Sequence, residues 1–105
     1  MAIGESNIVT PAGFAYETVA ASQTAQVLGT AGAVGDRIER LIISVATAAT
    51  STVTLIDNAT SIVITAANTP IGVYTVDLGI YSVSGPWKVT TGAGATVIAI
   101  GKFSV

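Results

Sequence analysis

Short segments rich in valine, isoleucine and threonine recur along this chain at intervals of about 8–12 residues, with turn residues between them. No segment shows a sustained helical period with capping residues. The segments predicted as strands are residues 14–20, 25–28, 40–45, 51–57, 61–65, 71–78, 80–83, 87–90 and 96–105. The sequence therefore predicts an all-β protein, an antiparallel β-sandwich or jelly roll of about seven or eight short strands.

A chain of 105 residues fits one domain. Residues 1–13 mix polar and apolar side chains without a period and close with Pro-Ala-Gly, which predicts an extended N-terminal arm ahead of a single β-sandwich domain at 14–105. Such an arm is either a frayed tail or a segment that lies on a neighbouring subunit or shell. In the second case Ile3, Ile8 and Val9 are the arm's candidate contact residues.

The surface of this chain is expected to be unusually apolar. Hydrophobic residues make up 50% of the sequence and charged residues 10%, against about 25% charged residues in ordinary domains. We infer that copies of the chain or a larger assembly cover part of that surface. The net charge of −2 provides no basic stripe, so a nucleic-acid partner is not expected.

Several kinds of chemistry lack their usual residues. The chain has no cysteine and no histidine, which removes the common zinc ligands and the base of the familiar nucleophilic triads. No metal, no cofactor and no enzymatic activity are therefore predicted. The longest apolar runs fall far short of the ~20 residues of a membrane helix, so no membrane partner is expected. The first residues carry an acid and no base, which favours a protein that does not pass through a secretory route.

The glycines and acids that resemble site residues have simpler interpretations. The spacing of Gly29, Gly32 and Gly35 fits turns better than a phosphate-binding loop. A glycosidase pair formed by carboxylates distant in sequence stays open as a minor alternative. The turn at Asp57 offers calcium only one carboxylate. The Asn-Ala-Thr sequon that follows is interpreted as accidental.

Four of the ten charged residues lie together in the stretch Asp36-Arg37-Ile38-Glu39-Arg40. The two arginines are expected to favour the charged form of these carboxylates, which opposes a general-acid role. Two hypotheses remain: an ordinary solvated entry to a strand, or an interface whose alternating charges set the register between subunits. The candidate subunit or capsid contacts here are Asp36, Arg37, Glu39 and Arg40.

The aromatic residues leave a second function open. Trp87 follows Gly85-Pro86 at the start of a strand and is predicted to lie in the core or at an interface. If Tyr74, Tyr81 and Trp87 line one groove that faces solvent, a glycan-binding module is favoured. If they are buried or lie at subunit contacts, that alternative is disfavoured.

Three segments carry a resemblance to a known family. The run VLGTAGAVGD at 27–36, the strand Leu41-Ile42-Ile43 and the run SGPWKVTTGAGATV at 84–97 resemble small structural proteins of tailed bacteriophages encoded among head genes. The likeness spans residues 25–105 and does not include 1–24. It implies a capsid decoration, or cement, protein: a small β-sandwich that trimerises on the outer shell and bridges neighbouring capsomers, with no catalytic residues.

The function expected from the sequence is therefore that of a non-enzymatic virion protein that decorates and stabilises the capsid. The alternative is a glycan-binding module of a phage tail or fibre. Its expected partners are its own copies, as a homotrimer, and the major capsid protein. Its expected location is the outer surface of the capsid, assembled in the host cytoplasm.

Overall fold

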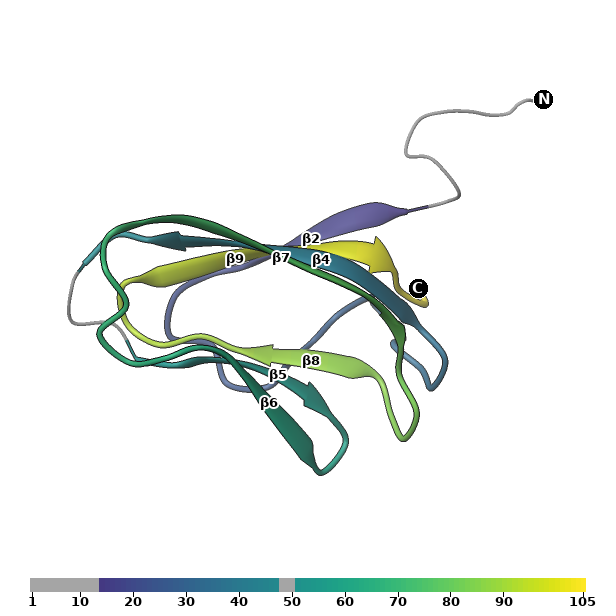
Figure 1. Ribbon diagram of the computed structural model, residues 1–105. Helices are drawn as coiled ribbons and strands as arrows, with labels where there is room; N and C mark the ends of the chain where they lie inside the picture. The colour runs from purple at the N-terminus through teal and green to yellow at the C-terminus, as the bar shows by residue number, and fades with distance from the viewer. Residues whose placement is uncertain (1–13, 48–50) are drawn as a thin grey trace.

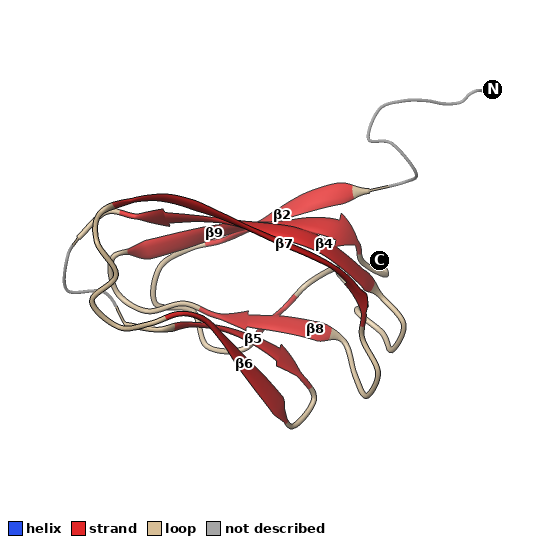
Figure 2. Cartoon of the chain, in the orientation of Figure 1, coloured by secondary structure: helices blue, strands red, loops and turns tan. Residues whose placement is uncertain are grey.

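The computed structural model describes residues 14–47 and 51–105, so the predicted N-terminal arm lies outside the described residues. The elements of the described ranges are β2 (Ala15–Val19), β3 (Gln26–Val27), β4 (Arg37–Val45), β5 (Val53–Asp57), β6 (Thr60–Thr65), β7 (Gly72–Tyr81), β8 (Trp87–Thr90) and β9 (Ala95–Lys102). The predicted all-β class is confirmed (Figures 1 and 2). The described ranges contain no helix, and therefore no helix long and apolar enough to cross a membrane.

The strands pair as one long hairpin rolled into two sheets. Strand β5 pairs with β6, β4 with β7, β3 with β8 and β2 with β9, and all four pairs are antiparallel. In the order of the sequence, each pair therefore encloses the pair named before it. The two four-stranded sheets have the orders β2-β9-β4-β7 and β3-β8-β5-β6. This nested order is that of a jelly roll, and the predicted sandwich is confirmed.

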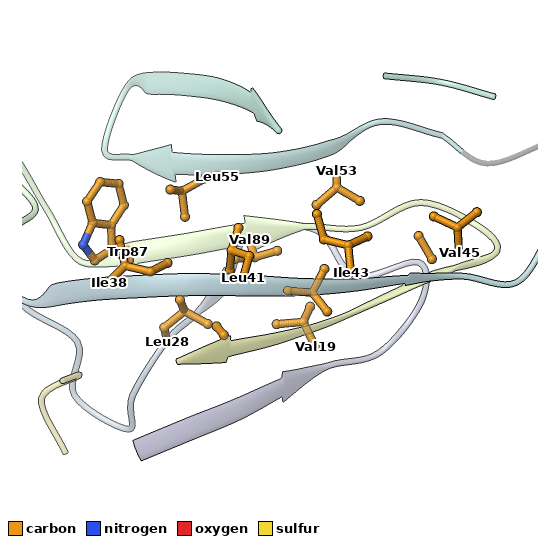
Figure 3. Packing of buried hydrophobic residues seen from close by; sticks show 13 residues of the cluster. Val19, Leu28, Ile38, Leu41, Ile43, Val45, Val53, Leu55, Trp87 and Val89 are labelled. Carbon is orange, nitrogen blue, oxygen red and sulfur yellow. The ribbon is translucent and has the colours of Figure 1, made fainter. Parts of the chain in front are cut away.

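The core lies between the two sheets, as period-2 alternation requires. Leu41 and Ile43 of β4 point inward from one sheet, and Val53, Leu55 and Trp87 point inward from the other (Figure 3). All five are buried, together with Val19, Leu28, Ile38, Val45, Val89, Ala95, Val97 and Ala99. Burying one large aliphatic side chain contributes roughly 1.5–3 kcal/mol, so these inward residues provide most of the driving force for folding.

Strands β4 and β7 are longer than the sequence pattern indicated. Strand β4 begins at Arg37 rather than at residue 40, so most of the charged stretch is strand. The segments predicted at 71–78 and 80–83 instead form one strand that ends at Tyr81. Both ladders of β4 are irregular between Ile38 and Arg40. Relative to β9, Glu39 is an extra residue, whereas in β7 two residues, 78 and 79, lie opposite it. A bulge of this kind interrupts the apolar alternation on which the prediction relied.

Two glycines make this irregular corner possible. Gly79 in β7 has φ +63, a left-handed conformation that glycine adopts without strain. A Cβ at Gly101 in β9 would collide with the backbone carbonyl oxygen of Arg37 in the neighbouring strand β4. Glycine at these two positions lets the backbones approach closely around the bulge.

One side of the sandwich is poorly covered. We call it the open side, and it consists of the edge strands β6 and β7 with the flanking residues Ile71 and Val83. In Figure 1 it lies along the near side of the sandwich. Of the twelve exposed large hydrophobic residues in the described ranges, seven lie here: Ile62, Val63, Ile71, Val73, Ile80, Tyr81 and Val83. Neither edge strand contains lysine or proline, the residues that commonly protect sheet edges.

Candidate functional site

The charged stretch at 36–40 lies at one end of the β2-β9-β4-β7 sheet. Register places Arg37 of β4 between Tyr81 of β7 and Lys102 of β9. Around it is a hollow of about 690 Å³, which we call the corner hollow. Its aromatic lining residues are Phe14, Tyr81 and Phe103, and its charged lining residues are Asp36, Arg37, Glu39 and Lys102.

Asp36, expected to contact a subunit or shell, is instead buried and bonded within its own chain. Its Oδ1 accepts a hydrogen bond from Ser104 Oγ at 2.6 Å, and its Oδ2 accepts bonds from the backbone N–H groups of Ser104 at 2.9 Å and Ala33 at 3.0 Å. Burial raises its pKa, but these bonds outweigh burial and hold the pKa below its ordinary value. Asp36 therefore fastens the segment after β9 to the loop before β4.

Arg37 is held by its neighbours on the same sheet face. Its Nε donates to Glu39 Oε1 at 2.9 Å, two residues along the same strand and on the same face. Its guanidinium carbon lies 5.1 Å from the centre of the Tyr81 ring and 6.0 Å from that of Phe14. The hydrogen bond to Glu39 is the main reason that the pKa of Arg37 lies above its ordinary value. The guanidinium is therefore a fixed, charged element of the hollow.

Arg40 lies one row further along the sheet, outside the hollow. Its Nε contacts Asp77 Oδ1 at 2.9 Å, and the Asp77 side chain is 76% exposed. Exposed ion pairs stabilise a fold by only about 0–1 kcal/mol. This pair is thus better suited to setting orientation at a contact than to holding the monomer together.

Trp87, expected in the core or at an interface, is a core residue that is 2% exposed. Its Nε1–H donates to the backbone carbonyl of Asp36 at 2.9 Å, so its one polar group has a partner. Tyr74 is half-buried against the same core, and its hydroxyl donates to the carbonyl oxygen of Pro70 at 2.7 Å. Tyr74, Tyr81 and Trp87 therefore do not form one groove that faces solvent. Ile3, Ile8 and Val9 lie outside the described residues.

Asp57, considered for calcium, has its carboxylate occupied by backbone donors. Oδ2 accepts from Val83 N at 2.9 Å, and Oδ1 accepts from Ser84 N at 3.1 Å and Gly85 N at 2.9 Å. The bond from Val83 is the main reason that its pKa lies below the ordinary value. Within 14–47 and 51–105, no three acidic side chains gather as metal ligands. Asp57 thus holds the turn between β7 and β8.

The two low-pKa carboxylates predict acid-sensitive stability. The same two carboxylates bind protons at higher pH in the unfolded chain than in the folded chain. Their contribution to folding stability is therefore present above about pH 4 and is lost as pH falls.

We expect Asp57→Asn to be less stable than wild type at pH 7, with the difference in stability shrinking between about pH 5 and pH 2. Urea midpoints measured across that range check this. Asn58→Gly, which keeps both carboxylates and suits the φ of +53, should retain the wild-type pH slope. A difference between Asp57→Asn and wild type that does not change with pH would contradict the assignment.

Some parts of the site have no local sequence signal. The predicted site residues did not include Phe14, Tyr81, Lys102 or Phe103, because their neighbours in the hollow are distant along the chain. Comparisons with models of protein families, with curated proteins and with solved structures found no match to this chain.

Proposed function

We propose that this protein is a non-enzymatic virion protein that decorates the outside of a tailed-phage capsid as a homotrimer. Its role is to stabilise the shell by bridging neighbouring capsomers. The resemblance at residues 27–36, 41–43 and 84–97 supports this proposal. The sandwich architecture is compatible with it.

The open side is the observation that carries the proposal. Val63, Val73 and Val83 are 60%, 69% and 79% exposed on two unprotected edge strands and their flank. Such a surface on a monomer marks a contact with another chain or an aggregation hazard. A trimer that turns its three open sides toward a common axis would cover this surface, leaving the remaining faces for the shell.

The stabilising mechanism would be mechanical cross-linking. A trimer that contacts several capsomers adds contacts that must break before the shell opens. Each contact can be weak, because binding at one point raises the effective concentration of the others. The Arg40–Asp77 pair on the sheet face would fix the orientation of such a contact rather than add much affinity.

Charged substitutions on the open side are expected to dissociate the trimer. Val63→Lys and Val73→Lys each place an ammonium group in the proposed contact, so we expect a shift to monomer in light scattering with the far-ultraviolet spectrum unchanged. Val34→Lys is the matched control, because Val34 is also 60% exposed but lies in the loop before β4. Equal oligomeric states for all three variants would place any subunit contact elsewhere.

Capsid binding is tested by co-sedimentation with shells stripped of this protein. We expect wild type to bind saturably and to raise the temperature at which the shells open. A strictly monomeric wild type that does not sediment with the shells would refute the proposed function.

A further inference from the structure

The corner hollow lies where the sheet departs from regular pairing. Relative to β9, Glu39 is an extra residue in β4, and it lies on the same face as Arg37, with which it forms an ion pair. On the facing strand, a Cβ at Gly79 would lie 3.3 Å from Arg37 Nη2, so glycine there leaves room for the guanidinium. Bulges are over-represented beside functional sites because they redirect side chains. Here, the irregular step lies beside a group of charged and aromatic side chains from β4, β7 and the segments that flank β2 and β9.

Half of the chain's six aromatic residues border this hollow. Phe14 precedes β2, Tyr81 ends β7 and Phe103 follows β9, so three distant segments contribute one ring each. Tyr81 is 61% exposed, and Arg37 packs against its ring at 5.1 Å. Contacts of this kind hold the rings in place before any ligand arrives, which lowers the entropic cost of binding.

The polar groups of the hollow are balanced in charge. Arg37 and Lys102 supply cations, and Asp36 and Glu39 supply carboxylates. A site for phosphate or a free carboxylate needs an excess of positive charge, which this lining lacks. Sugar hydroxyls both donate and accept hydrogen bonds, so they match a lining that presents both kinds of partner. The volume of about 690 Å³ is within the ordinary range for ligand sites.

We propose that the corner hollow binds a neutral saccharide of one or two pyranose rings. The C–H face of a ring packs on Tyr81, and the hydroxyls bond to Glu39, Arg37 and Lys102. Asp36 positions the segment that carries Phe103 and is not itself a ligand group, because its oxygens already accept three bonds. This proposal does not rest on the decoration function, although Tyr81 at the end of β7 belongs both to the corner hollow and to the open side.

Nuclear magnetic resonance titration of the full-length ¹⁵N-labelled protein tests the proposal. The probes are cellobiose, maltose, lactose and N,N′-diacetylchitobiose, each up to about 20 mM, a range that detects millimolar affinity. At least one is expected to give saturable shifts confined to residues 14, 35–40, 79–81 and 102–104. Sodium phosphate and sodium acetate are titrated in parallel as anionic probes. Saturable shifts with an anion and with none of the sugars would overturn the proposal, as would no saturable shifts with any probe.

Two substitutions inside the hollow and one outside it test where on the sheet the saccharide binds. Tyr81→Ala is expected to weaken binding of the responsive sugar about tenfold, and Glu39→Gln about fivefold. Tyr16→Ala is the matched control, because Tyr16 is 69% exposed on the same sheet but outside the hollow. Wild-type affinity in Tyr81→Ala, or an equal loss in Tyr16→Ala, would overturn the assignment. A dispersed spectrum for each variant shows that its fold is retained.

Discussion

Trp87→Ala is expected to lower the free energy of unfolding by about 3–5 kcal/mol, the range for truncating a buried aromatic residue. Trp87 is 2% exposed in the core of the jelly roll, so the change leaves a large cavity between the sheets (Figure 3). It also removes the indole N–H that donates to the carbonyl of Asp36. Since domains of this size are stable by only about 5–15 kcal/mol, much of the margin would be lost.

Urea denaturation of Trp87→Ala and Trp87→Phe separates these two contributions. Phenylalanine fills much of the volume but offers no donor, so we expect a cost of about 1–3 kcal/mol for the lost indole hydrogen bond and the smaller ring. The carbonyl of Asp36 keeps the bond that it accepts from the backbone N–H of Ser82. A Trp87→Ala protein within 1 kcal/mol of wild type, taken roughly as the limit for surface changes, would show that the tryptophan is not part of the core.

Asp36→Ala is expected to cost about 2–4 kcal/mol, because three donors lose their acceptor at a buried position. The loss should be largest locally: the segment around Ser104 would come away from the loop before β4. Hydrogen exchange of the Ser104 and Ala33 amides, together with urea midpoints, measures both effects.

Ser104→Ala is the matched control for Asp36→Ala. It removes only the side-chain donor and keeps the two backbone bonds to the carboxylate, so we expect about 0.5–1.5 kcal/mol. Equal effects of the two variants would mean that the backbone bonds contribute nothing. Unchanged protection of the Ser104 amide in Asp36→Ala would contradict the role of Asp36 as the fastener.

The fold was largely predictable because most strands alternate apolar and polar residues. Residues 87–90 were predicted with the boundaries that the structure has. The start of β4 was missed because Arg37 and Glu39 carry charges on both sides of Ile38, and the bulge then shifts the alternation. In β7, Gly79 was interpreted as a break, whereas its left-handed conformation continues the strand through an irregular step.

The roles of the acids were less accessible from the sequence. Asp36 accepts bonds from Ser104, 68 positions away, and Asp57 from Val83, 26 positions away. Nothing near either aspartate signals these donors. The charged neighbours of Asp36 in the sequence suggested an interface. In the structure Asp36 is buried, and its carboxylate bonds within its own chain. The corner hollow likewise depends on three segments that meet only after the sheets form.

The nested pairing has a consequence for how the protein is made. The corner hollow needs Phe14 and Phe103, which flank β2 and β9, the outermost pair of the rolled hairpin. The inner pairs β5–β6 and β4–β7 can close before the outermost pair forms, but the hollow is complete only after β2 and β9 have paired. Contacts between distant segments also form late because of their loop-closure cost. A nascent chain therefore has no complete corner hollow until β9 has been released and has paired.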